Sequence, residues 1–247
     1  MPRFFVTSTQ IENDVVTLTG DDARHISRSL RMAVGDWITV CDMQRTEYLC
    51  ELTDFLPDAV KGRVLSASPS TTEPPVHITL YQALPKGDKL DTVIQKAVEC
   101  GVSCVRPFES ERCVVRCKKE SEAHKTERRT RIALEAAKQC GRGILPEVLP
   151  TCSFEEMLAG AGACDAVLFC YEGDGTRPIG QLLASLSLKP GARIAIVVGS
   201  EGGFSIPEAE RARACGFHMT GLGRRILRTE TAPLFALACV CCALELN

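Results

Sequence analysis

The sequence predicts a mixed α/β protein in two parts, a small β-rich N-terminal domain and a larger C-terminal domain with a mainly parallel sheet. Three features of the 247-residue chain support this prediction. Short apolar stretches separated by turn residues come first. A segment rich in Ser, Thr and Pro follows at residues 66–75. Beyond it, apolar strands alternate with amphipathic helices, which is typical of helices packed on a parallel sheet.

The N-terminal part is expected to hold four strands and one short helix. Turns are predicted at Gly20-Asp21-Asp22 and at Gly35-Asp36, because Gly and Asp favour turn geometry. Short strands at this spacing are typical of a small barrel or sandwich. The expected helix covers residues 25–31, and the expected strands cover residues 15–18, 37–41, 48–52 and 61–65.

The segment 66–75 is expected to be a linker. It contains five Ser or Thr and three Pro residues in ten positions, so it has little apolar surface to bury. Proline also disfavours both helix interiors and ladder pairing. We therefore expect a domain boundary here, between residues 1–72 and residues 73–247.

In the C-terminal part, runs of apolar residues typical of strands alternate with apolar residues at helical spacing. Apolar residues between Leu90 and Val98 recur at helical spacing and form one face of a helix. Ser205 and Glu208 form a capping box, with Pro207 near the first helical position, so a second helix begins there. Ligands of such folds bind beyond the carboxyl ends of the strands. The expected strands cover residues 76–81, 102–107, 166–171, 193–198 and 217–221.

Composition excludes several classes of protein. A net charge of −2 excludes a chain whose whole surface attracts nucleic acid. Fourteen cysteines are too few for a disulfide scaffold of this length, and no secretory signal is visible, so we expect a cytoplasmic protein with reduced thiols. The longest apolar stretch, 232–246, is shorter than the roughly 20 residues that span a bilayer. No membrane association is expected.

Positive charge is concentrated in two places. Ten basic residues stand against five acidic ones between Glu111 and Arg142, and Arg24, Arg28 and Arg31 form a second cluster. The planar fork of Arg suits phosphate recognition. A solvated helix face explains residues 118–131 equally well when they are taken alone. Two separated basic patches on an otherwise acidic chain favour a structured polyanion as the partner.

Two glycine-bearing turns are the sharpest motifs. In the first, Gly199-Ser200-Glu201-Gly202-Gly203 follows an apolar strand and precedes the capped helix. Glycine allows backbone groups to approach a ligand closely, although an ordinary strand-to-helix turn would look similar. The second turn, 221–232, leads into the last apolar helix. Helix capping explains its Thr and Glu residues, but it leaves Arg228 at the positive end of a helix, where an anionic partner is expected.

The cysteines give no metal signature. Cys239 and Cys242 have a C-x-x-C spacing, and Cys113 and Cys117 lie four apart, but no histidine accompanies either pair. A structural zinc site needs four such ligands. Because residues 239–242 fall in an apolar helix, we expect these thiols to pack in the core. No metal is expected.

Several further landmarks accompany the two glycine turns: His25–Arg31 with Gly35-Asp36, Pro85–Lys89 followed by Gln95–Val102, and Glu135–Arg142. In order and spacing, these landmarks resemble the RsmE-type ribosomal RNA methyltransferases of the SPOUT class, over nearly the whole chain. Ser200 departs from the family, which usually has Pro there, and Cys100 stands where Leu is common.

The resemblance implies a PUA-like β-barrel over residues 1–72 and a SPOUT α/β domain with a C-terminal trefoil knot over residues 73–247. It also implies a homodimer that binds S-adenosylmethionine in the knot, among loops at 168–173, 199–204 and 222–228. The residues expected to bind this cofactor are Leu168, Gly199, Gly202, Gly203, Leu222, Leu227 and Thr231.

The implied reaction methylates N3 of a uridine in 16S rRNA of the small ribosomal subunit. Because N3–H is weakly acidic, the site must stabilise the anion that develops when the proton leaves. Arg228 is the expected stabiliser, and Glu230 and Glu201 are candidates for a base or an orienting group. The residues expected to contact RNA are His25, Arg28, Arg31, Lys86, Lys89, Arg112, Arg116 and Arg142.

Two other functions fit the same residues. One is a SPOUT methyltransferase that acts on a ribose 2′-hydroxyl or on transfer RNA. The other is a non-catalytic RNA-binding or ribosome assembly factor on the same scaffold. Cofactor binding separates the second from an enzyme, and mapping of the modified atom separates the first from an N3 methyltransferase.

Overall fold

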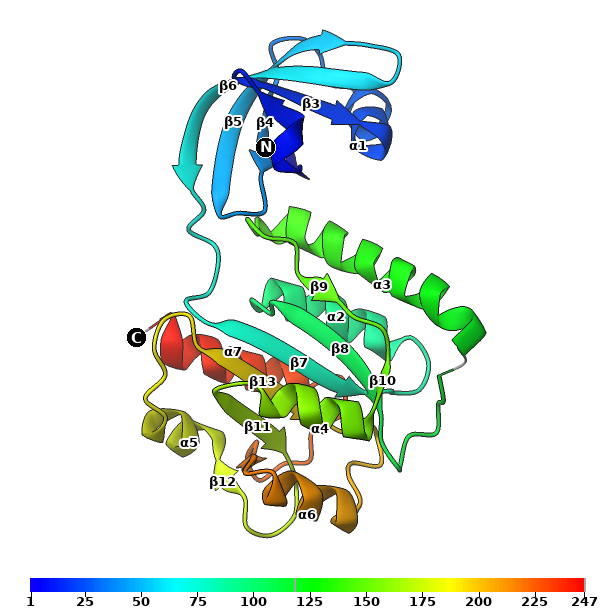
Figure 1. Cartoon of the computed structure of the whole chain (residues 1–247), viewed down its shortest axis with the longest axis vertical. Coiled ribbons are helices and arrows are strands. Elements are labelled where there is room, and N and C mark those ends of the chain that lie inside the picture. Colours follow the sequence, from blue (N-terminus) through cyan, green and yellow to red (C-terminus); the bar gives the residue numbers. More distant parts are fainter. Residues whose placement is uncertain (118, 247) are drawn as a thin grey trace. The chain divides into compact units, whose positions relative to one another are not determined.

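A computed structural model describes residues 1–117 and 119–246 (Figure 1). The chain forms two compact units. Unit 1 comprises Met1–Glu73 and Ala137–Leu145, and unit 2 comprises Pro74–Ala136 and Pro146–Asn247. Unit 1 is rich in β-strand and unit 2 alternates strand and helix, so the mixed α/β class predicted from the sequence is confirmed.

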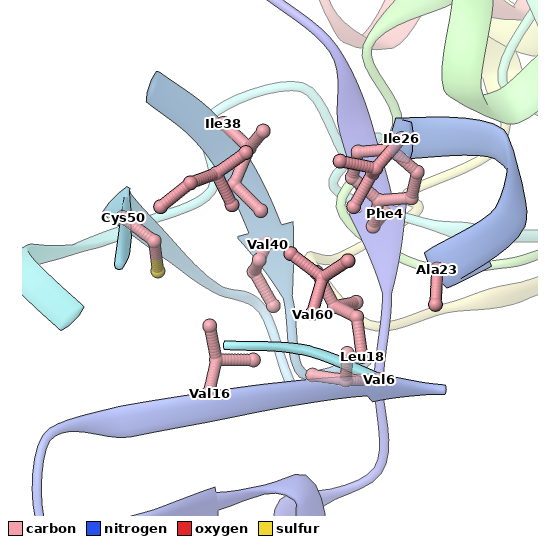
Figure 2. Close-up of a cluster of buried hydrophobic side chains, with 11 residues drawn as sticks. Phe4, Val6, Val16, Leu18, Ala23, Ile26, Ile38, Val40, Cys50 and Val60 are labelled. Carbon is pink, nitrogen blue, oxygen red and sulfur yellow. The ribbon is translucent and has the colours of Figure 1, made fainter. Parts of the chain in front are cut away.

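Six strands of unit 1 form one sheet in the order β1-β4-β5-β6-β3-β2. The β1–β4 pair is parallel, and the other pairs are antiparallel. The strands are β1 (Arg3–Phe5), β2 (Ile11–Glu12), β3 (Val15–Thr19), β4 (Trp37–Cys41), β5 (Thr46–Phe55) and β6 (Ala59–Pro69). Residues from five of these strands converge on one buried cluster that includes Phe4, Leu18 and Ile38 (Figure 2). The sheet therefore encloses a single core.

The predicted linker begins too early. Residues 66–69 belong to β6 and pair with residues 46–49 of β5, with Ser66 opposite Leu49 and Ser68 opposite Glu47. The helix predicted at residues 25–31 is present over His25–Ser29 as a π-helical turn, and α1 (Gly20–Arg24) precedes it where a turn was predicted. Ala23 and Ile26 of these turns complete the core shown in Figure 2.

Unit 2 contains an eight-stranded sheet in which every pair is parallel. Its order is β10-β8-β7-β13-β11-β14-β12, and β9 pairs with β8. The strands are β7 (His77–Ala83), β8 (Cys104–Glu109), β9 (Glu147–Val148), β10 (Cys152–Ser153), β11 (Ala166–Cys170), β12 (Arg177–Pro178), β13 (Arg193–Val198) and β14 (His218–Gly221). The central strands are apolar and buried almost throughout, as strands covered on both faces must be.

The helices that follow these strands belong to unit 2, except that residues 137–140 at the end of α3 belong to unit 1. The helices are α2 (Lys89–Glu99), α3 (Lys119–Cys140), α4 (Phe154–Gly162), α5 (Ile179–Ser185), α6 (Ile206–Ala214) and α7 (Ala232–Leu244). α2 buries the predicted apolar face between Leu90 and Val98. α6 begins at the predicted capping box, where the Ser205 hydroxyl accepts a hydrogen bond from the Glu208 N–H. In Figure 1, α4 lies on the near face of the sheet and α7 on the far face.

The cysteines are all free, and their placement is only partly the predicted one. Cys239 and Cys241 on α7 are half-buried, whereas Cys242 is exposed, so not every thiol of this helix packs in the core. Within residues 1–117 and 119–246, no group of three or more His, Cys, Asp or Glu side chains is arranged to hold a metal ion. Nor does any helix of that part of the chain have the length and apolarity needed to cross a membrane.

Candidate functional site

A cavity of about 700 Å³ opens in unit 2 at the carboxyl ends of three neighbouring strands. The strands are β13, β11 and β14, and the segments that follow them line the cavity: residues 170–173, 198–204 and 221–229. This is the edge where parallel sheets bind ligands. The three loops predicted to gather at one site therefore do so.

Glycines make the first of these loops possible. A Cβ atom on Gly199 would stand 3.0 Å from Gly203 Cα and 3.2 Å from the Phe204 ring, so the loop folds back on itself too tightly for a side chain. Gly203 has a φ of +63°, and Gly223 in the other loop has a φ of +107°, conformations that favour glycine. The two turns thus present backbone directly to the cavity.

A buried polar network lies beneath both loops. Gln82, next to the last residue of β7, is fully buried, and its Nε2 donates to the Gly199 carbonyl at 3.2 Å and to Thr229 Oγ1 at 3.1 Å. The Thr229 hydroxyl donates to the same Gly199 carbonyl at 2.8 Å. The sequence reasoning missed Gln82 and explained Thr229 only as a helix cap. The available signal was a polar residue at the end of an apolar strand.

The charged candidates form a cluster at the cavity. Lys89 Nζ lies 2.8 Å from Glu201 Oε1 and 3.4 Å from Glu230 Oε2, and Arg228 Nη1 lies 4.0 Å from Glu230 Oε1. The Lys86 N–H also donates to Glu201 Oε1. Lys89, Glu201 and Arg228 line the cavity, whereas Glu230 lies beside it. The three expected catalytic residues are therefore brought together.

The ion pair sets the charge state of its members. Burial works to raise the pKa of the Glu201 carboxyl, but hydrogen bonds from Lys89 and from backbone N–H groups outweigh it and hold that pKa below its usual range. The hydrogen bond to Glu201 raises the pKa of the Lys89 ammonium. Both groups are thus charged at neutral pH. The side chain of Arg228 is more exposed than those of Lys89 and Glu201: 84% of it is open to solvent.

The other residues expected at the cofactor site lie at different depths. Leu222 and Leu227 line the cavity together with the three glycines. Leu168 is fully buried within β11, in register with Ile196, and is not part of the lining. Thr231 is exposed at the start of α7 and is also outside the lining.

Two of the expected RNA ligands belong to the cavity instead. Lys89 lies between the two carboxylates, and Arg112 donates to the Gly202 carbonyl at 3.0 Å. Lys86 is exposed nearby. Arg116 is exposed, but its guanidinium donates to the carbonyls of Ser110 and Glu111. Lys118, in the same basic stretch, lies outside the described residues.

Unit 1 presents a basic surface of its own. His25, Arg28 and Arg31 are all exposed on the helical turn after α1 and the residues that follow it. The His25 ring meets Phe4 edge-on, with centroids 6.3 Å apart. Arg24 is also exposed and forms an ion pair with Asp21.

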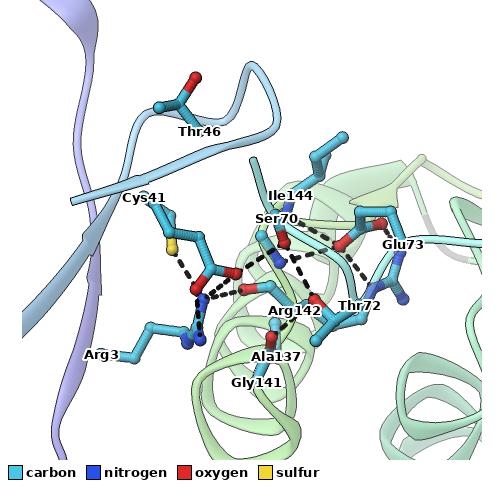
Figure 3. Close-up of polar contacts among 12 residues, drawn as sticks. Arg3, Cys41, Thr46, Ser70, Thr72, Glu73, Ala137, Gly141, Arg142 and Ile144 are labelled. Atoms are coloured by element: carbon cyan, nitrogen blue, oxygen red, sulfur yellow. Dashed lines mark hydrogen bonds and ion pairs between the residues drawn. The ribbon is translucent and has the colours of Figure 1, made fainter. Parts of the chain in front are cut away.

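Arg142 was expected to contact RNA, but the structure buries it. Only 4% of its side chain is exposed, and its Nη2 and Nε lie 2.7 and 3.0 Å from the two carboxylate oxygens of Glu73 (Figure 3). Glu73 Oε1 also accepts the N–H groups of Gly143 and Ile144. Burial works to raise the pKa of Glu73, but these hydrogen bonds hold it below its usual range. The pair ties residues 142–144 to the end of the first segment of unit 1.

The basic stretch is thus only partly a solvated face. Arg129 on α3 is buried and pairs with Glu122 at 3.1 Å, and Glu122 also accepts hydrogen bonds from Thr151. Arg128 and Arg131 remain half or more exposed. Charge in the sequence therefore overstates the cationic surface that is available to a partner.

Comparison with known proteins identifies the relatives of this chain. Residues 72–241 match the RNA methyltransferase domain family, and residues 18–64 match the RNA methyltransferase PUA domain family. Ribosomal RNA small subunit methyltransferase E of Bacillus subtilis (strain 168) is 36% identical, over 100% of this chain and 98% of that protein. The Synechocystis protein of the same name is 32% identical, over 98% of this chain and 78% of its own length.

A solved structure agrees with these sequence relatives. Ribosomal RNA small subunit methyltransferase E from Neisseria gonorrhoeae, bound to S-adenosylmethionine, superposes with a TM-score of 0.83 and 32% identity. The match covers 98% of this chain and 97% of that one. On full-length similarity in sequence and in fold, this chain belongs to the ribosomal RNA small subunit methyltransferase E family.

Proposed function

We propose that this chain is an S-adenosylmethionine-dependent methyltransferase that acts on 16S ribosomal RNA of the small subunit. The observation that carries the proposal is the cavity at the ends of β13, β11 and β14, in a chain similar over its full length to enzymes of that name. The relative from Neisseria gonorrhoeae is bound to the same methyl donor.

The cavity fits such a donor. Its volume of about 700 Å³ lies in the usual range for small-molecule sites, roughly 300–1,000 Å³. Gly199 and Gly202 allow this loop to pack closely around the cavity, since a Cβ on Gly202 would meet Arg112 Cβ at 3.1 Å. Leu222 and Leu227 supply apolar walls, and Glu201 supplies a carboxylate. These backbone and apolar groups suit a small molecule with apolar and polar parts. The lining holds five basic residues against two acidic ones, which suits an RNA substrate: Lys89, Arg112, Arg224, Arg225 and Arg228 against Glu172 and Glu201.

The bound donor would supply an electrophilic methyl group, and the residues of the chain would prepare the acceptor. We propose N3 of a uridine as that acceptor. Its N–H lies on the Watson–Crick edge, so the base must be unpaired to enter the cavity. Arg228 would stabilise the negative charge that develops on the uracil when the N3 proton leaves. One of Glu201 and Glu230, both held by Lys89, would accept the N3 proton, and the other would orient the base.

The finer features of the fold and assembly belong to the same proposal. We infer that the C-terminal segment forms the trefoil knot of a SPOUT domain and that unit 1 is a PUA-like barrel. A homodimer is supported by α7, an apolar helix on which Phe235 is still 38% exposed, with Leu246 beyond its end 77% exposed. Action in the cytoplasm follows from the proposed substrate.

The test is methylation of small ribosomal subunits that lack the modification, with donor carrying a labelled methyl group. Digestion of the RNA to nucleosides then identifies the modified atom. Label in 3-methyluridine supports the proposal. Label in a 2′-O-methyl nucleoside, or label accepted only by transfer RNA, contradicts it. If calorimetry detects no binding of the methyl donor, the chain is instead a non-catalytic RNA-binding factor.

Gly199→Ala is expected to weaken donor binding roughly five- to hundredfold. The new Cβ would press on the Gly203 backbone, which cannot move aside as a flexible side chain would. Overpacking of this kind costs about 1–3 kcal/mol, and each 1.4 kcal/mol is tenfold in affinity. Calorimetric titration measures the change. Gly180→Ala on α5 is the control, because its Cβ meets nothing within 4 Å. Equal donor affinity in the two variants would contradict the role of Gly199.

Arg28→Gln with Arg31→Gln is expected to weaken RNA binding uniformly across sequences. Phosphate contacts position RNA without reading bases, and loss of one lowers the salt dependence of log K by about 1. The measurement is RNA affinity at several salt concentrations. Lys189→Gln is the control, because this exposed lysine precedes β13 and so lies at the end of the sheet away from the cavity. An unchanged salt slope in the double variant would remove both arginines from the RNA surface.

A further inference from the structure

We propose that Gln82 is a positioning residue that sets the spacing of the two cavity loops, residues 199–204 and 221–229. The proposal deepens the proposed function, because it rests on those loops holding the methyl donor. Gln82 touches neither the cavity nor the reacting atoms, so it would act only through Gly199 and Thr229.

The position of Gln82 suits this role. It is the second-last residue of β7, which pairs with β13, and it lies in register with Val198, the last residue before loop 199–204. Its side chain crosses beneath that loop and reaches Thr229, which is 147 residues away in sequence. One buried side chain therefore contacts both loops at once.

The chemistry requires an amide and not a carboxylate. Three acceptors surround Nε2: the Ala83 carbonyl at 3.0 Å, the Gly199 carbonyl at 3.2 Å and Thr229 Oγ1 at 3.1 Å. Carbonyls cannot donate, so the NH₂ group must face them. Gln82 Oε1 is left buried without a hydrogen-bond partner among the described residues. A buried polar atom left unpaired is costly. The side chain nevertheless turns its NH₂ group toward the three acceptors, although this leaves Oε1 unpaired.

The network also fixes the direction of one peptide group in the cavity wall. Gln82 and Thr229 both donate to the Gly199 carbonyl. The peptide bond between Gly199 and Ser200 is trans, so the N–H of Ser200 points away from that carbonyl. Gly199 and Ser200 both line the cavity. Loss of the amide would leave this peptide, and the link between the two loops, held by the single hydrogen bond from Thr229, so both loops should become more mobile.

The first measurement uses the unliganded protein. Hydrogen exchange is compared in wild type, in Gln82→Met, which keeps the length of the side chain without its hydrogen bonds, and in Gln181→Met, a control at an exposed site on α5. We expect faster exchange in both loops of Gln82→Met and no change in the control. Unchanged exchange in either loop would overturn the proposal, whether or not the protein binds the donor.

The second measurement is donor affinity. Gln82→Glu keeps the shape but places a carboxylate against the carbonyls, and we expect binding weaker by about ten- to hundredfold, the range for an unsatisfied buried group. Affinity in this variant should recover relative to wild type as the pH falls, because a protonated carboxyl can donate to the Gly199 carbonyl. The comparison is made at pH values at which circular dichroism shows the variant to be folded, because a fold destabilised by the buried carboxylate would recover in acid as well. Wild-type affinity in a folded Gln82→Glu would contradict the role.

A double-mutant cycle tests the link to Thr229. Gln82→Met and Thr229→Val remove opposite ends of one hydrogen bond, so their combined effect on affinity should be smaller than the product of the two single effects. Thr229→Ser, which keeps the hydroxyl, should bind more tightly than Thr229→Val. Multiplicative effects would show that the two residues act independently and would overturn the proposal. A wild type that binds no donor would count against the proposed function, and the exchange experiment would still decide the role of Gln82.

Discussion

Arg228→Ala is expected to lower methylation by about 100- to 1,000-fold while the protein stays folded. The magnitude is that of removing one preorganised group that stabilises developing charge. The side chain of Arg228 is 84% exposed and its ion pair with Glu230 spans 4.0 Å, so truncation should disturb the fold little. Its backbone carbonyl, which accepts the N–H groups of Thr231 and Ala232, is retained. The loss should therefore fall on kcat.

The measurement is single-turnover methylation at saturating donor and RNA, together with donor affinity by calorimetry. Arg228→Lys keeps the charge but not the planar fork, so it should recover only part of the rate. Arg211→Ala is the control, since it removes another arginine from an exposed ion pair, with Glu155 on α4. Turnover near that of wild type in Arg228→Ala would exclude Arg228 from the mechanism.

The parts of the fold predicted from the sequence are those with a local signal. β13 is a continuous apolar run bounded by turns, and the structure has it at the predicted residues, Arg193–Val198. The capping box at Ser205 likewise marks the start of α6. By contrast β9, β10 and β12 have two residues each and carry no periodicity. Residues 66–69 look like a linker because their side chains are exposed, yet their backbone pairs with β5.

The residues of the site likewise fall into those that a local sequence pattern indicates and those that depend on distant partners. The glycine turns were predictable because close backbone approach leaves a composition that can be read locally. Gln82 and Arg142 were not, because their roles depend on partners far away in sequence. Thr229 lies 147 positions from Gln82, and Glu73 lies 69 positions from Arg142. A positive charge in a basic stretch looks the same whether it faces RNA or a buried carboxylate. Only the fold separates the two.

Arg142→Met is expected to destabilise unit 1 by about 3–5 kcal/mol without a specific loss of RNA affinity. The variant leaves Glu73 buried and charged without its counterion, and removal of one partner of a buried pair typically has this cost. Only 6% of the Glu73 side chain is exposed, so water cannot replace the guanidinium. Trp37, the only tryptophan of the chain, lies in β4 of unit 1, so its fluorescence during urea unfolding reports on this unit.

The double variant Glu73→Gln with Arg142→Met separates loss of the charge from loss of packing. Gln can still accept the N–H groups of Gly143 and Ile144 through its oxygen, and no unpaired charge remains, so the double variant should be more stable than Arg142→Met alone.

The pH dependence of stability gives a second test of the pair. The pKa of Glu73 is lower in the folded state than the ordinary 4.5, so its contribution is present above about pH 4.5 and is lost as the pH falls through the folded value. Wild type should lose this increment in acid and the double variant should not. Equal acid sensitivity in the two proteins would show that the Glu73–Arg142 pair does not stabilise unit 1.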